Sequence, residues 1–241
     1  MTSAAPASGN TSGITYASAG VDVEAGDRAV ELMKGAVKAT HNSSVIGGVG
    51  GFAGLYDVSK LLTFKKPLLA TSTDGVGTKV AIAQAMDIHD TIGFDLVGMV
   101  VDDIVVVGAE PLYMTDYIAC GRVVPERIAA IVKGIAEACV VAGCALVGGE
   151  TAEHPGLLAP DEYDVAGSTT GVVEAAKLLG PGLVRAGDAV VAMASSGLHS
   201  NGYSLVRHVL LEKAGWALDR NVPELGRALG EELLTPTRIY A

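Results

Sequence analysis

The chain has 241 residues, of which 49% are hydrophobic and only 18% are charged, and its formal net charge is −10. This length suits one large or two modest domains with a full core, and the composition excludes disorder for most of the chain. The negative charge argues against nucleic acid and acidic membrane surfaces as main partners.

The sequence gives no sign of membrane insertion or secretion. It contains no run of 18 apolar residues, and no apolar run follows Met1 before the first basic residue, Arg28. We therefore expect neither a membrane span nor a secretory signal. Three cysteines without CxxC spacing, Cys120, Cys139 and Cys144, predict reduced thiols in the core of a cytoplasmic protein.

Helices and strands alternate along the predicted chain. Residues 1–15 lack periodicity and predict a disordered tail. A helix is predicted from Asp22, because Val30, Met33 and Val37 fall on one face. The later elements are a strand at 67–73, a helix at 90–108, a strand at 112–119, a helix from Pro125, strands at 144–148, 164–173 and 189–194, and a helix through about Ala214. This order predicts an α/β or α+β class with mixed sheets.

A polar, glycine-containing segment, STDGVGTK at 72–79, ends the first of these strands. Asp74 stands where ligand-facing residues are common, and Lys79 could supply positive charge to an anion. Gly75 and Gly77 could turn backbone N–H groups toward a ligand. The segment lacks the Walker A pattern, and a plain turn around Asp74 and Gly75 is an equally good interpretation.

Carboxylates interrupt the apolar helix predicted at 90–108. Asp95, Asp102 and Asp103 would be costly there unless they face water, are paired or bind a metal. Glu150 follows a buried strand and two glycines, so it could reach the same cation, and oxygen ligands suit Mg²⁺. His199 stands at a helix start, where it is either a plain loop residue or close to a bound anion. Together these features predict phosphate chemistry with Mg²⁺.

A set of longer sequence strings carries a family resemblance. They occur in this order: YASAGVD at 16–22, GGVGGFAG at 47–54, STDGVGTK at 72–79, GFDLVGMVVDDIVVVGAEPLYMTDY at 93–117, LVGGETAEHPG at 146–156, YDVAG at 163–167, SSGLHSNGYSLVR at 195–207 and LLTPTRIY at 233–240. The chain resembles the aminoimidazole ribonucleotide synthetase family, also called phosphoribosylformylglycinamidine cyclo-ligase, from about Tyr16 to its last residue.

The resemblance implies an enzyme of purine synthesis that uses ATP and Mg²⁺. It would close the imidazole ring of formylglycinamidine ribonucleotide and release aminoimidazole ribonucleotide, ADP and phosphate. It also implies a two-domain fold, with an ATP-binding and dimerisation domain at 16–168 and the first part of a C-terminal domain at 169–241. A homodimer would form through the first domain.

Several positions match residues that the family places in its site. Lys34 matches a lysine near the nucleotide, and Asp74 and Asp103 match acidic residues that we expect to bind Mg²⁺. Glu150 is a third, weaker candidate ligand. His199 matches a histidine at the cleft, with an expected role in handling the ring-closure proton or the substrate. A glycine-rich loop would cover the phosphates through Gly47, Gly48, Gly50 and Gly51.

Two departures from the family pattern are visible. Asp102 stands where the commoner pattern has Asn, and the sequence ends before a further glycine-rich segment that contributes to the substrate site. We therefore expect residues 169–241 to be an incomplete second domain that needs further partners. Two alternatives stay open, which are a small-molecule kinase of the same superfamily and an inactive dimerisation fragment.

Overall fold

The computed structural model describes residues 15–241, so most of the predicted tail lies outside the described residues. Its centre is a four-stranded sheet in the order β3-β6-β4-β5. These strands span Pro67–Gly75 (β3), Tyr163–Glu174 (β6), Glu110–Cys120 (β4) and Ala145–Glu153 (β5). β6 pairs antiparallel with both of its neighbours, and β4 and β5 are parallel. The predicted α/β class with mixed strands is therefore confirmed.

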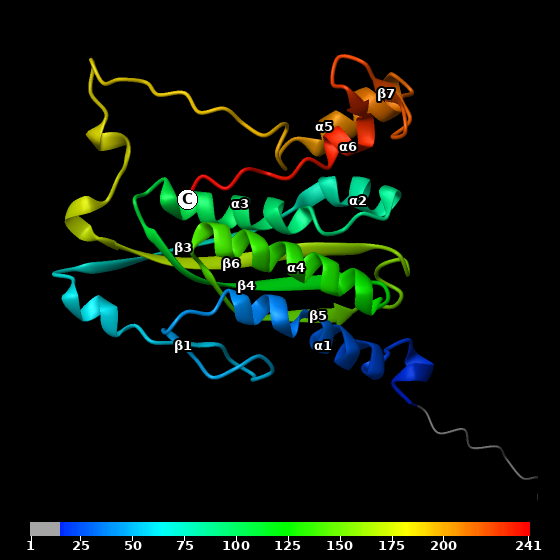
Figure 1. Ribbon diagram of the computed structural model, residues 1–241, viewed down its shortest axis with the longest axis horizontal. Helices are drawn as coiled ribbons and strands as arrows, with labels where there is room; N and C mark the ends of the chain where they lie inside the picture. The colour runs from blue at the N-terminus through cyan, green and yellow to red at the C-terminus, as the bar shows by residue number, and fades with distance from the viewer. Residues whose placement is uncertain (1–14) are drawn as a thin grey trace, which may run out of the picture.

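Three long helices cover one face of this sheet and leave the other open (Figure 1). They are α1 (Val23–Ala39), α3 (Ile92–Val105) and α4 (Pro125–Ala142). Asp22 caps α1 by accepting a hydrogen bond from the amide of Ala25, and Pro125 opens α4 at a position where no N–H is needed. Both predicted helix starts are confirmed.

The remaining elements are short. They are β1 (Val45–Ile46), β2 (Leu55–Tyr56), α2 (Val80–Met86), α5 (Tyr203–Arg207), β7 (Asn221–Val222), β8 (Arg227–Ala228), α6 (Leu229–Leu233), a π-type turn at His208–Lys213 and 3₁₀ turns at Ala17–Ala19, Ser59–Thr63, Gly77–Lys79, Ala175–Lys177 and Pro181–Leu183. No helix within residues 15–241 is long and apolar enough to cross a membrane.

The core lies between the sheet and the helices. Alternate residues of β4 point into it, and α3 and α4 supply the facing apolar side chains, which are Ile92, Leu96, Val100, Ile128, Ile131 and Ile135. The two helices cross closely because Gly93 lies against the backbone of Gly134 and Ile135. A Cβ on Gly93 would come within 2.1 Å of the Ile135 amide nitrogen.

All four strands of the sheet extend beyond at least one of their predicted ends. β5 continues through the glycines of GGET, which we expected to stop it, and remains paired with β4 as far as Glu153. β6 runs without a break from Tyr163 to Glu174, so the predicted domain boundary at 168/169 falls inside a strand. A boundary between two elements would have to lie before Tyr163 or after Glu174.

The predicted strand at 189–194 is wrong. This segment is extended but has no pairing partner, and its apolar side chains are exposed: Val190 to 96%, Val191 to 81% and Met193 to 72%. A segment of high β-propensity forms a strand only where a neighbouring strand supplies hydrogen bonds. After this segment the chain forms α5 and α6, and its last residues run along α3 (Figure 1).

Candidate functional site

Two of the predicted carboxylates lie at the β3 edge of the sheet. Ser72 and Asp74 are two residues apart on β3, so their side chains share a face of the strand. The Ser72 hydroxyl donates a hydrogen bond of 2.7 Å to Oδ2 of Asp103 on α3. This contact ties α3 to the end of β3. Asp74 and Asp103 are both exposed there, so both could bind a cation.

Asp102 forms a hydrogen bond with the backbone near the end of the chain. Its Oδ1 accepts a hydrogen bond of 3.1 Å from the amide of Tyr240. Burial raises the pKa of the Asp102 carboxyl, and the hydrogen bonds from the backbone of Tyr240 and Ala241 oppose that rise. Asp102 thus bonds to the chain itself, whereas its neighbour Asp103 is exposed.

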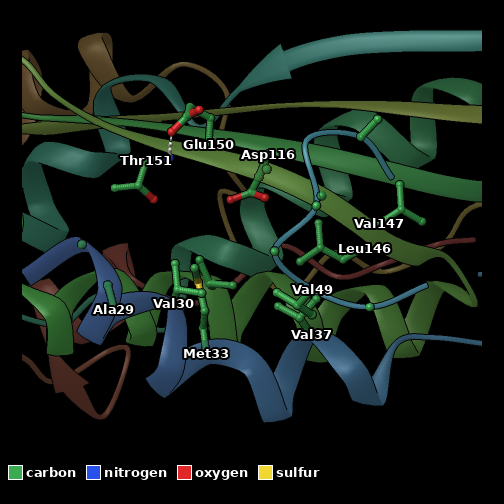
Figure 2. A pocket seen from close by; sticks show the side chains of 18 of the residues that line it. Ala29, Val30, Met33, Val37, Val49, Asp116, Leu146, Val147, Glu150 and Thr151 are labelled. Atoms are coloured by element: carbon green, nitrogen blue, oxygen red, sulfur yellow. Dashed lines mark hydrogen bonds between the residues drawn. The ribbon is translucent and has the colours of Figure 1, made fainter. Parts of the chain in front are cut away.

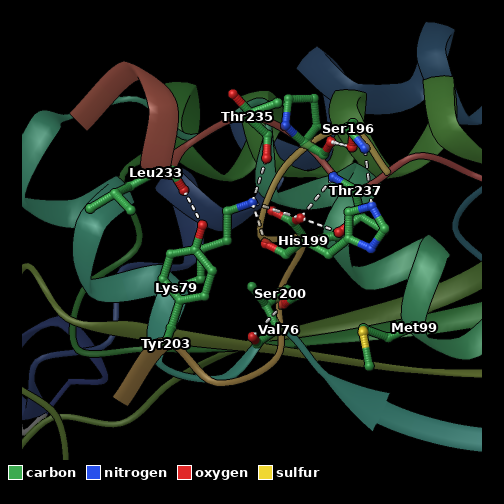
Figure 3. A network of polar contacts seen from close by, with 12 residues as sticks. Val76, Lys79, Met99, Ser196, His199, Ser200, Tyr203, Leu233, Thr235 and Thr237 are labelled. Atoms are coloured by element: carbon green, nitrogen blue, oxygen red, sulfur yellow. Dashed lines mark hydrogen bonds and ion pairs between the residues drawn. The ribbon is translucent and has the colours of Figure 1, made fainter. Parts of the chain in front are cut away.

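Lys79 does not face the open site, contrary to prediction. Its side chain is fully buried, and Nζ donates to Oδ1 of Asp95 at 2.8 Å, to the carbonyl of His199 at 2.9 Å and to the carbonyl of Thr235 at 2.8 Å (Figure 3). All three ammonium protons are therefore used within the chain. The amide and hydroxyl of Thr237 also donate to Asp95.

Burial shifts the pKa values of the two partners of this ion pair in opposite directions. It lowers the pKa of Lys79 and raises the pKa of Asp95, while the contact between the two groups opposes both shifts. Because Oδ1 of Asp95 receives three hydrogen bonds, we assign the pair its charged form. Lys79 and Asp95 thus join the first domain to the segments around His199 and Thr235.

His199 is held in a strained backbone conformation. Its φ of +59° lies in the left-handed region, which costs energy for a residue with a side chain. Its carbonyl bonds to Lys79, and its ring lies edge-on to Tyr240 with the centroids 5.8 Å apart. The amide of Ser196 donates to Nε2 at 3.3 Å. The half-buried imidazole is thereby fixed close to the end of the chain.

The other predicted site residues lie at the opposite edge of the sheet. Glu150 is on β5, Lys34 is on α1, and the glycine loop at 47–51 passes beside β5. Lys34 is about half exposed and forms an ion pair of 2.7 Å with Glu31. Since β3 and β5 are the two outer strands, β6 and β4 separate Glu150 from Asp74. Within one chain, Asp74 and Asp103 therefore share the β3 edge, and Glu150 lies at the opposite edge.

Asp116 is a candidate residue that sequence reasoning missed. It lies at an inward position of β4, and its carboxyl reaches a cavity of about 250 Å³ between the sheet and α1 (Figure 2). Burial raises the pKa of Asp116 to about 7. The sequence signal for this residue is the alternation along β4, which places one acid among inward-facing apolar residues: Leu112, Met114, Asp116 and Ile118.

The oxygen donors at the β3 edge are of the chemical kind that Mg²⁺ binds. No group of three or more metal-binding side chains occurs among residues 15–241, and Asp74 and Asp103 remain as two carboxylates beside an open surface. Mg²⁺ is usually bound through one or two carboxylates together with substrate phosphates and water. The chain could thus supply two ligands to an ion that also binds phosphate oxygens.

Comparison with known proteins identifies the family. A family model described as AIR synthase related protein, N-terminal domain, matches residues 56–173, and its C-terminal counterpart matches residues 185–241. The chain belongs to the AIR synthase related protein family. The first match ends at residue 173 and the second begins at residue 185, which agrees with a domain boundary after β6.

Curated relatives with the same name match almost the entire chain. A phosphoribosylformylglycinamidine cyclo-ligase of Geobacillus sp. (strain WCH70) is 58% identical over 93% of this chain, and one of Geotalea daltonii is 53% identical over 94%. In both cases the match covers 65% of the relative. The chain therefore spans 65% of the length of these AIR synthase relatives.

Solved structures share the fold at low sequence identity. A thiamine-monophosphate kinase from Stenotrophomonas maltophilia matches 86% of this chain and 60% of its own, with a TM-score of 0.58 and 19% identity. A hydrogenase maturation protein HypE matches 83% of this chain and 56% of its own, with a TM-score of 0.50 and 17% identity. These likenesses support the AIR synthase-like fold and carry no information on the substrate.

Proposed function

We propose that the protein closes the imidazole ring of aminoimidazole ribonucleotide, using ATP and formylglycinamidine ribonucleotide, in the purine synthesis of the cytoplasm. The observation that carries this proposal is the 58% identity to a phosphoribosylformylglycinamidine cyclo-ligase over 93% of the chain. Because the match covers 65% of that relative, the activity is assigned to the protein at its relatives' full length.

The formyl oxygen of the substrate is a poor leaving group, and this determines the order of the chemical steps. The formyl oxygen of the substrate cannot leave as hydroxide or oxide, so ATP first transfers its terminal phosphoryl group to that oxygen and leaves as ADP. The amidine nitrogen then attacks the activated carbon, and the C–O bond breaks to release phosphate together with the formyl oxygen. Ring closure also releases a proton from nitrogen, and His199 is the proposed group that accepts it.

The carboxylates of Asp74 and Asp103 would bind Mg²⁺ together with phosphate oxygens of ATP. Such an ion supplies positive charge that stabilises the phosphoryl group during transfer. Ser72 orients Asp103 through its 2.7 Å hydrogen bond. The backbone of the glycine loop at 47–51 and the ammonium of Lys34 would contact the phosphates from the β5 side.

Two copies of the chain would bring these parts together. Asp74 and Asp103 lie at the β3 edge, whereas Lys34, Glu150 and the glycine loop lie at the β5 edge. One face of the sheet is free of helices (Figure 1), and on it Leu69 is 64% and Tyr117 40% exposed. Pairing of two such sheets in a homodimer would cover this face and set the two edges opposite each other.

A small-molecule kinase of the same superfamily, which the sequence left open, remains the second candidate. The two candidates differ in what happens to the transferred phosphoryl group. Growth without added purines of a bacterial strain that lacks its cyclo-ligase, when supplied with the gene for this protein, would support the ring closure. Failure of a well-expressed protein to restore growth, with a stable phosphorylated product in vitro, would support the kinase.

Removal of either carboxylate charge should strongly impair catalysis. We expect Asp74→Asn and Asp103→Asn each to lower kcat by about 10²-fold or more, because each removes a ligand that helps neutralise the transferred phosphoryl group. The measurement is steady-state turnover of the full-length protein at saturating ATP over a range of Mg²⁺ concentrations. Asp90→Asn, at an exposed position before α3, is the matched control and should retain activity. Wild-type kcat in both site variants would contradict the assignment.

Mixing two inactive variants tests whether two chains share a site. We expect Lys34→Gln to be impaired through weaker ATP binding, while Asp103→Asn is impaired through loss of the metal ligand. In a shared site, a dimer of one variant with the other keeps one intact site, so the mixture should recover activity that neither variant has alone. The activity is measured after the two proteins are mixed, unfolded and refolded together. A mixture no more active than its components would contradict a site built from two chains.

A further inference from the structure

The last residues of the chain lie along one face of α3 (Figure 1). Asp95 accepts hydrogen bonds from Thr237, and Asp102 accepts one of 3.1 Å from the amide of Tyr240. A Cβ on Gly98, which lies between these two acids, would come within 2.7 Å of Cγ2 of Thr237. Because Asp95, Gly98 and Asp102 follow at helical spacing, they form one continuous contact face that fixes the position of Tyr240.

The same residues also hold the loop that carries His199. The Ser196 hydroxyl donates to the carbonyl of Pro236 at 2.7 Å and accepts from the amide of Arg238 at 3.0 Å. The Arg238 guanidinium donates to the carbonyl of Ala194 at 2.8 Å. The Ser196 amide is thereby fixed 3.3 Å from Nε2 of His199 (Figure 3).

This contact determines which nitrogen of His199 carries the lone pair. A backbone N–H can only donate, so Nε2 must accept, and the neutral imidazole carries its hydrogen on Nδ1. The hydroxyl of Tyr240 also lies 3.4 Å from Nε2. No hydrogen bond to Nδ1 occurs within residues 15–241. The nitrogen that can accept a proton is therefore the one that Ser196 and Tyr240 both approach.

Only one of these two neighbours can transfer a proton to Nε2. A hydroxyl can take up a proton at oxygen while it releases its own, whereas the Ser196 amide cannot. The ring of Tyr240 stays beside the imidazole through the edge-on contact of 5.8 Å, and Tyr240 is half-buried. The 3.4 Å distance is long, as catalytic hydrogen bonds often are before substrate binds.

Two charged groups lie close to His199. The carboxyl of Asp102 interacts electrostatically with the imidazole, and the Lys79 ammonium bonds to the backbone carbonyl of His199. A carboxylate stabilises an imidazolium that forms beside it, and the charge of Lys79 is balanced by Asp95. The surroundings of His199 thus suit a ring that gains a proton at Nε2.

We propose that the Tyr240 hydroxyl is a catalytic residue that relays the ring-closure proton to Nε2 of His199. The proposal rests on the proposed function, which supplies the reacting amidine nitrogen. As the ring closes, an N–H bond of that nitrogen breaks and its electron pair stays on nitrogen. The proton binds to the oxygen of Tyr240, while the hydroxyl proton of Tyr240 moves to Nε2. Tyr240 ends neutral and His199 ends as the imidazolium, which returns the proton to water.

Removal of one hydroxyl group tests the relay in the protein at its relatives' full length. Tyr240→Phe keeps the ring beside His199, so we expect kcat to fall about tenfold or more while KM for both substrates stays within about threefold. Tyr163→Phe is the matched control, because it also removes a hydroxyl bonded to a histidine, Nδ1 of His89 at 2.8 Å, and should keep kcat unchanged. Ring closure by Tyr240→Phe at the wild-type kcat would overturn the relay and leave the proposed function standing.

Nuclear magnetic resonance of the 241-residue chain with ¹⁵N-labelled histidine tests the geometry without any turnover. At alkaline pH, the signals of His199, identified by their loss in His199→Gln, should show the hydrogen on Nδ1 in both wild type and Tyr240→Phe. The loss of kcat in Tyr240→Phe is then due to the missing hydroxyl rather than to a displaced imidazole. A hydrogen on Nε2 in the wild-type protein would overturn the relay. A full-length protein that forms no aminoimidazole ribonucleotide would contradict the proposed function and the relay together.

Discussion

Replacement of Lys79 by methionine should lower the free energy of unfolding by roughly 3–5 kcal/mol, the usual cost of removing one partner of a buried ion pair. The substitution would leave Asp95 buried without its cation, and it would remove the donor shared by the carbonyls of His199 and Thr235. The unfolding free energy is measured by chemical denaturation at constant pH. The segments that contain His199 and Thr235 should also lose protection from hydrogen exchange.

Two further variants show whether the buried charge is the cause. Lys133→Met removes an exposed lysine that pairs with Glu137 at 3.6 Å, so it should change stability by less than about 1 kcal/mol. The double variant Lys79→Met with Asp95→Leu removes both charges and should recover much of the loss. A loss for Lys79→Met as small as that for Lys133→Met would show that the ion pair does not join the two regions.

Asp116→Asn should stabilise the protein at alkaline pH. The folded pKa of about 7 lies above the ordinary value of 3.8, so the folded state holds this proton more tightly than the unfolded state. The stability of the wild-type protein therefore falls as pH rises from about 4 to 7, and the full cost is present above that range. Asparagine carries no charge at any of these pH values, so the Asp116→Asn variant does not lose this stability.

The predicted signature is a pH-dependent difference between two proteins. Between pH 5 and pH 8, the advantage of Asp116→Asn over wild type should grow by roughly 2–3 kcal/mol. Denaturant unfolding at several pH values measures it, and Asp27→Asn, at an exposed position of α1, serves as the control. A difference that stays constant with pH would mean that Asp116 has an ordinary pKa in the folded protein.

Local signals predicted most of the fold. The capping of α1 by Asp22, the start of α4 at Pro125 and the strand at 112–119 are all set by residues close in sequence, and the structure confirms them. The segment 189–194 has the composition of a strand, but pairing depends on a partner that local sequence does not reveal. For the same reason, the glycines at 148 and 149 predict the end of a strand, although both pair with β4.

The arrangement of the site depends on long-range contacts that local patterns do not contain. Lys79 stands in a glycine-rich loop typical of ligand binding, yet its partners include carbonyls 120 and 156 residues further along the chain. Glu150 lies on β5 and Asp74 lies on β3, but the sheet order puts these two strands at opposite edges. Residue types thus indicated the chemistry, whereas the order of the strands decides which groups can meet in one chain.

The stoichiometry of turnover tests the proposed function most directly. The protein at its relatives' full length is mixed with formylglycinamidine ribonucleotide, ATP and Mg²⁺, and ADP, phosphate and the imidazole product are measured in the same sample. The proposed ring closure predicts equal amounts of ADP, free phosphate and aminoimidazole ribonucleotide at every time point. ADP formed together with a stable phosphorylated product, and with neither free phosphate nor imidazole, would contradict the cyclo-ligase assignment.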